Sequence, residues 1–157
     1  MRFTLPGHAR RRARQCLRDD QYLLDALLES VAVAVVAWGG DGRLTHASRR
    51  ASELLGAKCP LAGDPHDVIE ALRPRTPSGI PLVREDLPYV RALQGEAVRG
   101  VDVLVHIRGC DLLLSTIARP VYDERGRRRG AVALLEDVTE RRRDEARLRE
   151  SAPPMPL

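Results

Sequence analysis

The stretch that most constrains the fold lies near the C-terminus, where residues 119–143 read RPVYDERGRRRGAVALLEDVTERRR. An apolar run ends at Asp123, and residues 123–126 have the composition of a turn. A second apolar run begins at Gly130 and ends in a charged segment. This pattern predicts two antiparallel strands joined by a hairpin turn, with the second strand leading directly into a charged helix.

Earlier segments supply three more strands and the helices between them. β-Branched residues, alternation and flanking glycines mark the strands, whereas apolar residues three or four positions apart mark the helices. The expected strands are Val31–Trp38, Arg43–Ala47, Val101–Ile107, Leu112–Ala118 and Gly130–Glu136. The expected short helices lie within residues 48–56, 66–72 and 85–95. The order is therefore strand, strand, helices, and then three strands.

Three motifs of this chain are similar to those of PAS domains. Asp137-Val138-Thr139-Glu140-Arg141 resembles the signal motif that joins the last PAS strand to an outgoing helix. Residues 85–96, EDLPYVRALQGE, resemble a PAS segment that forms a cofactor-facing helix. Residues 48–56 resemble a third motif, although Ser48 replaces its Asn and Arg49 its Pro. Because serine keeps an oxygen that can cap a helix, the resemblance holds at this position.

The resemblance covers about residues 20–145 and implies an α+β fold. We expect a PAS fold with a five-stranded antiparallel sheet, short helices on one face, a flanking N-terminal helix and a C-terminal signal helix. The expected organisation is a basic flexible tail (1–18), an N-terminal amphipathic helix (19–30), a PAS core (31–137), a C-terminal signal helix (138–150) and a disordered tail (151–157). Six arginines precede the first acidic residue, Asp19, and account for the whole positive excess of the chain.

No catalytic motif is present in the sequence. It has no phosphate-binding loop ending in Lys-Ser/Thr, no GxSxG and no HExxH. We therefore expect a non-catalytic PAS sensory or protein-interaction module of bacterial signal transduction, which could bind a small ligand and signals through its C-terminal helix to a partner. The partner would be an unknown signalling protein, because little chain follows that helix. One alternative is a ligand-free dimerisation or docking protein. Another, less favoured, is a nucleic-acid-associated protein that uses the arginine-rich tail.

The sequence argues against the common PAS cofactors. Heme-binding relatives place a His on the helix before the third strand, where this chain has Tyr89. The polar residues that hold flavin are missing around Cys59. Three scattered cysteines without a CxxC pair indicate neither a zinc site nor a disulfide framework. We thus expect no heme, flavin or metal, while a small apolar ligand remains open.

Alternation and helical spacing give a set of residues expected to face the space between sheet and helices. These candidate pocket residues are Val33, Val35, Val68, Ile69, Leu72, Leu87, Val90, Val103, Val105, Leu113, Val132 and Leu134. Such residues belong to the core first and to a ligand pocket second.

A stripe of four leucines marks the N-terminal helix: Leu23, Leu24, Leu27 and Leu28. We expect this stripe to cover the open face of the sheet, in its own subunit or a partner's, and to form a homodimer. No apolar run approaches the roughly 18 residues of a membrane span, and no secretory signal is evident. We therefore expect a cytoplasmic protein without a membrane partner.

Overall fold

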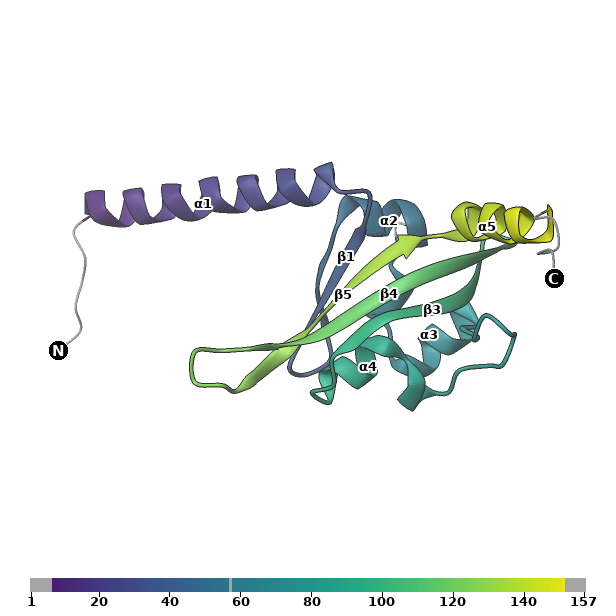
Figure 1. Ribbon diagram of the computed structural model, residues 1–157. Coiled ribbons are helices and arrows are strands. Elements are labelled where there is room, and N and C mark those ends of the chain that lie inside the picture. Colours follow the sequence, from purple (N-terminus) through teal and green to yellow (C-terminus); the bar gives the residue numbers. More distant parts are fainter. Residues whose placement is uncertain (1–6, 57, 152–157) are drawn as a thin grey trace, which may run out of the picture. The chain divides into compact units, whose positions relative to one another are not determined.

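The computed structural model describes residues 7–56 and 58–151 (Figure 1). Residues up to Ala32 and residues from Val33 onward form two compact units, and each is described by itself. The first unit contains helix α1 (Gly7–Ser30). The second contains β1 (Ala34–Gly39), β2 (Leu44–Ala47), α2 (Arg49–Leu55), η1 (Pro60–Ala62), α3 (Pro65–Leu72), η2 (Arg84–Asp86), α4 (Pro88–Leu93), β3 (Val98–Ile107), β4 (Cys110–Tyr122), β5 (Arg128–Asp137) and α5 (Thr139–Ser151).

Helix α1 is longer than the sequence analysis expected, because it begins at Gly7 rather than at Asp19. The basic segment was assigned to a flexible tail on account of its charge. Arg, Ala, Gln and Leu are nevertheless strong helix formers, so the segment continues the helix. The remainder of that predicted tail, and the predicted C-terminal tail after Ser151, lie outside the described residues.

The second unit is built on a five-stranded antiparallel sheet in the order β2-β1-β5-β4-β3. Strand β5 is central: its Ala133 is paired with Val36 of β1 and with Ala118 of β4. The strand that the sequence predicted to follow the hairpin therefore joins the two halves of the sheet. Helices α2, α3 and α4 lie on one face (Figure 1). The five-stranded antiparallel sheet with short helices on one face, predicted from the sequence, is confirmed.

Ser48 fastens the first helix of this layer to the sheet. Its buried hydroxyl accepts hydrogen bonds from the backbone N–H of Val35 (3.0 Å) and of Ala51 (3.2 Å). Its own N–H donates to the Val35 carbonyl oxygen at 2.8 Å. The serine that replaces the family's Asn thus caps α2, as expected, and also binds strand β1.

Strands β1 and β5 approach each other unusually closely at Gly130. This residue has a φ of +155°, and a Cβ atom added there would overlap the Trp38 carbonyl oxygen. Only glycine fits such a position. Gly130 therefore fixes how the hairpin joins the centre of the sheet.

Among the residues that the structure describes, none of the helices combines the length and the hydrophobicity that a membrane span requires.

Candidate functional site

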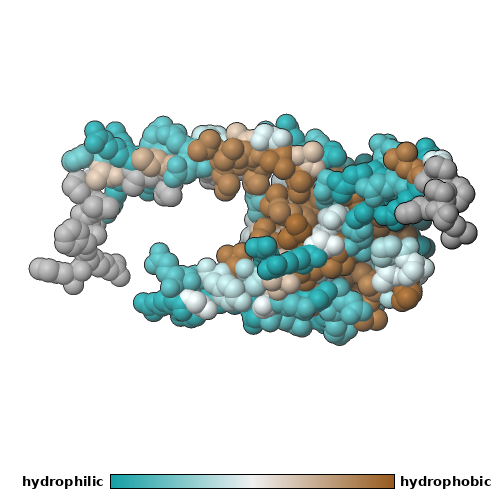
Figure 2. Space-filling model, in the orientation of Figure 1, coloured by the Kyte–Doolittle hydropathy of each residue, from teal (hydrophilic) through white to brown (hydrophobic). Residues whose placement is uncertain are grey.

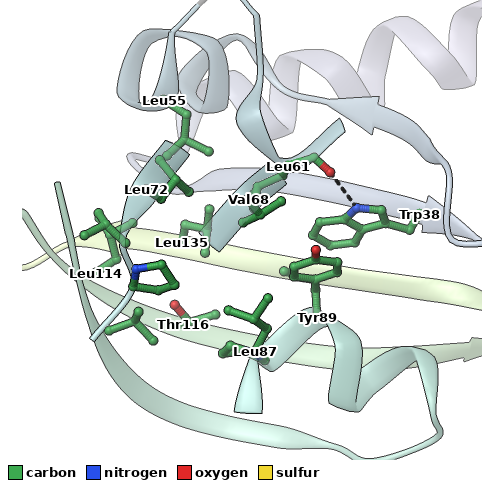
Figure 3. Close-up of a pocket in the computed structure, with 15 residues that line it drawn as sticks. Trp38, Leu55, Leu61, Val68, Leu72, Leu87, Tyr89, Leu114, Thr116 and Leu135 are labelled. Atoms are coloured by element: carbon green, nitrogen blue, oxygen red, sulfur yellow. Dashed lines mark hydrogen bonds between the residues drawn. The ribbon is translucent and has the colours of Figure 1, made fainter. Parts of the chain in front are cut away.

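A small apolar cavity lies between the sheet and its helical layer. Its volume is about 50 Å³, and both layers contribute to its walls. The lining residues are Trp38, Leu55, Leu61, Val68, Leu72, Pro74, Leu87, Pro88, Tyr89, Val103, Val105, Leu114, Thr116, Ala133 and Leu135 (Figure 3). A site for one water needs roughly 10–15 Å³. The cavity therefore has room for a molecule of a few non-hydrogen atoms, unless its walls move.

Two aromatic side chains stack at the edge of the cavity. The rings of Trp38 and Tyr89 are 4.6 Å apart between centroids and nearly parallel, with an angle of 12°. Trp38 also donates a hydrogen bond from Nε1 to the Leu61 carbonyl oxygen at 3.1 Å (Figure 3). Trp38 comes from β1, Leu61 from η1 and Tyr89 from α4, so this cluster joins three elements around one wall.

The hydroxyl group of Tyr89 is buried and has no hydrogen-bond partner among the described residues. Burial, reinforced by the negative charge of Asp64, raises the pKa of Tyr89 to about 12. The phenol therefore stays neutral and can act as a donor. Thr116, a second polar residue that lines the cavity, is also buried. A buried polar group without a partner costs stability, which makes such a group a candidate for ligand binding.

The structure places only part of the predicted pocket set around this cavity. The residues that line it are Val68, Leu72, Leu87, Val103 and Val105. Val90 is buried and Ile69 partly buried in the core, but neither is in the lining. The others in the set are Val33, Val35, Leu113, Val132 and Leu134, and none of them lines the cavity.

The predicted face of the sheet is wrong for the strand residues of that last group, which are Val35, Leu113, Val132 and Leu134. Val35 is paired with Leu134, one position away from the core pair Val36 and Ala133. Leu134 and Ile117, which pair with each other, are 37% exposed on the opposite face. The prediction placed the larger side chains inward. The core face of β4 and β5 instead carries the buried Ala118, Ala131 and Ala133, and helix α4 packs against these two strands.

Sequence reasoning missed the most distinctive lining residues, Trp38, Tyr89 and Thr116. A signal was available, because the chain has only one Trp and three Tyr. A lone Trp in an apolar strand favours the buried face. Counting in steps of two from Trp38 would have placed Val36 and Ala34 in the core, as observed.

The predicted signal motif forms the junction between β5 and α5. The Thr139 hydroxyl donates to Asp137 Oδ1 at 2.6 Å and accepts from the Leu113 N–H at 2.9 Å. The N–H of Val138 donates to the Leu113 carbonyl oxygen at 2.9 Å, and the Val138 side chain is fully buried. Both polar groups of Leu113 therefore hold the start of α5.

Ion pairs reinforce this junction. Arg142 lies 3.2 Å from Asp102 of β3, and Arg141 lies 3.5 Å from Glu136 of β5. The second oxygen of Asp102 is buried without a partner among the described residues. No residue of α5 itself is buried, and Glu140 is exposed. The helix is therefore held to the sheet only at its first turn.

The cavity wall and the α5 junction share one piece of backbone. Leu114 lines the cavity, and its neighbour Leu113 binds Thr139 and Val138. Leu114 is also paired in register with Asp137, the first residue of the signal motif. The strand that supplies Leu114 to the cavity wall therefore also pairs with β5 and binds the start of α5.

Side chains that bind metals do not gather anywhere in the described part of the chain. The three cysteines are free, with Cys59 half-buried and the other two exposed. On α1, the side chains of Leu23, Leu24 and Leu27 are 61%, 55% and 56% exposed, and Leu28 is half-buried. The leucine stripe predicted from the sequence therefore lies largely in solvent.

Comparison with known proteins points to one family. The family model described as the PAS fold matches residues 28–143. The PAS domain of an HTR-like protein from Haloarcula marismortui has a TM-score of 0.56 at 19% identity, covering 81% of this chain and 98% of that one. The PAS domain of nitrogen regulation protein NR(II) from Vibrio parahaemolyticus has a TM-score of 0.51 at 16% identity, covering 73% and 97%. The PAS domain of BvgS from Bordetella pertussis has a TM-score of 0.50 at 16% identity, covering 85% and 99%. No curated protein matches the sequence.

Proposed function

This chain belongs to the PAS family, and on that premise we propose that it is a signalling module in which the cavity controls the pose of helix α5. Two of the similar folds come from a nitrogen regulation protein and from a sensory box histidine kinase/response regulator of Burkholderia thailandensis. PAS domains in such proteins serve as sensory or interaction modules. We propose the same role here, without a reaction of its own.

The observation that carries this proposal is the adjacency of Leu114 and Leu113. A ligand that enters the cavity pushes on Leu114, whereas Leu113 holds the α5 junction through Thr139 and Val138. A shift in β4 changes both hydrogen bonds of Leu113 together. Because α5 has no other buried contact, its direction depends on this junction.

The ligand we propose is small, neutral and predominantly apolar. The walls leave about 50 Å³, and they are formed by aliphatic and aromatic side chains. A charged ligand would be costly to bury there. One hydrogen-bond acceptor on the ligand, reached by a small movement of Tyr89, would pair the hydroxyl that otherwise has no partner.

Fluorescence of Trp38 provides the test, because Trp38 lines the cavity and is the only Trp in the sequence. We expect a panel of small neutral alcohols, ketones and hydrocarbons to include one that shifts the emission of the native protein. Val103→Ile with Val105→Ile fills the cavity and should abolish the shift. Val132→Ile, on the other face of β5, is the matched control and should retain it.

Hydrogen exchange at the amides of Leu113 and Val138 measures the proposed output. We expect a ligand that shifts Trp38 emission to change the protection of both amides, because they bind the α5 junction. A ligand that enters the cavity and leaves the protection of both amides unchanged would refute a link between the cavity and the α5 junction.

Autophosphorylation or nucleotide cyclisation by pure protein would contradict the non-catalytic role.

The second candidate function is a ligand-free docking or dimerisation module, which the small cavity volume favours. In either case, we propose that the protein acts on another chain and forms a homodimer through the leucines of α1. Light scattering at micromolar concentration tests this. We expect a dimer mass for the native chain and a shift toward monomer for Leu24→Gln with Leu28→Gln, because both substitutions remove apolar contact from the stripe without changing its charge.

A further inference from the structure

Helix α1 has an unusual distribution of charge. All five of its arginines lie in its first half, between Gly7 and Arg18, and all four acidic residues lie in its second half, from Asp19 onward. The change of sign falls at the midpoint of the 24-residue helix. Figure 2 shows the hydrophilic first half and the hydrophobic side chains that accompany the acidic half.

This distribution is unfavourable for a helix on its own. Arginines near the N-terminus and Glu29 near the C-terminus oppose the helix dipole, and the first turn contains no acid. No arginine of α1 has an acidic residue three or four positions away. Like charges do occur at that spacing, as in Arg10 and Arg14, Arg14 and Arg18, or Asp25 and Glu29. The charges of α1 therefore lack favourable neighbours along their own helix.

Helix α5 provides the contrast within the same chain. It is also charged and has no buried residue, yet its basic and acidic residues are interspersed and pair with each other. Arg142 lies 3.2 Å from Glu145, and Arg147 lies 3.9 Å from Asp144. α5 is thus suited to stand in solvent, whereas α1 combines separated charges with exposed leucines.

We propose that α1 pairs with α1 of a second copy of this chain in an antiparallel arrangement, which rests on the homodimer proposed above. In a full overlap, the basic half of each helix faces the acidic half of the other. Arg18 then lies opposite Asp19 of the second copy, and Leu28 lies opposite the small Ala9. Leu23 and Leu27 lie opposite Arg14 and Arg10, whose aliphatic stems can cover apolar surface. The dipoles of the two helices then point in opposite directions, which is also favourable. A parallel pair would place five arginines against five.

Salt dependence distinguishes the two orientations. Raising salt from about 0.1 M to about 1 M shortens the screening length from ~10 Å to ~3 Å. We expect the antiparallel dimer to weaken several-fold, since attraction between opposite charges is lost. A parallel dimer would instead become tighter, because repulsion between like charges would be screened. A dimer that tightens with salt overturns the proposal.

Spin labels give the orientation directly. In a variant without its native cysteines, a label at His8→Cys should lie roughly 30 Å from its copy, at 1.5 Å per residue along the antiparallel pair. A label at position 16 alone should lie within about 10 Å of its copy along the axis, which confirms that the helices are paired. A short distance at position 8 would overturn the antiparallel orientation and leave the dimer itself intact.

Charge reversal completes the test. Arg11→Glu, Arg12→Glu and Arg14→Glu together should weaken the dimer at least tenfold, because two acidic halves then meet. Adding Asp19→Arg, Asp20→Arg and Glu29→Arg should restore it. Arg49→Glu with Arg125→Glu, on exposed positions of the other unit, serves as the control. Circular dichroism should show that α1 persists, since acids at its N-terminus favour the helix. An unchanged dimer after the first reversal, or a native chain that stays monomeric, overturns the proposal, and neither outcome affects the cavity experiments.

Discussion

Replacing Tyr89 with Phe should stabilise the ligand-free protein. The Tyr89 side chain is 6% exposed, stacks on Trp38, and carries a buried hydroxyl without a partner among the described residues. Phenylalanine keeps the ring and the stack and removes only the hydroxyl. A substitution that removes a group facing the cavity would ordinarily be expected to cost stability, so the sign of the effect is informative.

The magnitude follows from the cost of an unpaired polar group. An unsatisfied buried hydroxyl costs about 1–3 kcal/mol, so Tyr89→Phe should raise the free energy of unfolding by that amount. For a chain of this size, each kcal/mol changes the melting temperature by roughly 2–4 °C. Tyr122→Phe is the matched control, because Tyr122 is 53% exposed. Its substitution should change stability by less than about 0.5 kcal/mol.

The pKa of Tyr89 adds a pH dependence with a defined sign. Its folded-state value of about 12 exceeds the ordinary value of 10.0, so folding favours the protonated phenol. The stabilising contribution of this difference is complete below pH 10 and is lost as the pH rises from about 10 to about 12. Phenylalanine has no such loss. The advantage of Tyr89→Phe over the native chain should therefore grow across this range.

Urea unfolding followed by circular dichroism measures both effects, at pH 7 and between pH 10 and pH 11. A Tyr89→Phe protein that is less stable than the native chain at pH 7 would refute the reasoning. That result would mean that the hydroxyl has a partner in solution, such as a bound water or a ligand retained through purification. A mass spectrum of the native protein under gentle conditions would then identify a retained ligand.

Substitutions at three further positions test the framework around the site. Ser48→Ala should cost about 1.5–5 kcal/mol in urea unfolding, because it removes the α2 cap and leaves the Val35 N–H without its acceptor, whereas Ser48→Asn should retain most of that stability. Gly130→Ala should destabilise by more than about 3 kcal/mol, since its Cβ would meet the Trp38 carbonyl oxygen; a melting temperature near that of the native chain would contradict the close approach. Thr139→Val should speed hydrogen exchange at the Leu113 amide with little change at Val36, and equal protection in both proteins would argue against the junction.

The sequence was sufficient for the order of the elements but not for the faces of three strands. The hairpin, the Ser48 cap and the signal motif all depend on residues with specific backbone roles, and the structure has them where the motifs predicted. Strand β1 is different, because VAVAVVAW is apolar at odd and even positions alike. Alternation then cannot choose a face, and only Trp38 indicates which one is buried.

Strand β5 shows a second limit of the sequence. Its segment AVALL suggests that Val132 and Leu134 face the core, because they are larger than the alanines between them. The core face instead carries Ala131 and Ala133, which allow the helical layer to come close. Which face needs small residues depends on the packing distance between layers, and no single strand records that distance. The same ambiguity explains why the sequence predicts Leu113 as a pocket residue, whereas Leu114 lines the cavity.

The attachment of α5 by its first turn alone has a mechanical consequence. The helix has 13 residues, so it extends about 20 Å from its root at 1.5 Å per residue. A tilt of about 10° at Thr139 would move the far end by roughly 3.5 Å, from the length of this lever arm. In the mechanism proposed above, a side-chain movement of a fraction of an ångström beside Leu114 would therefore be enlarged several-fold at Ser151. A partner that contacts the far end of α5 would then respond to the contents of a small cavity, because the helix is stiff along its length and is attached to the sheet at its first turn.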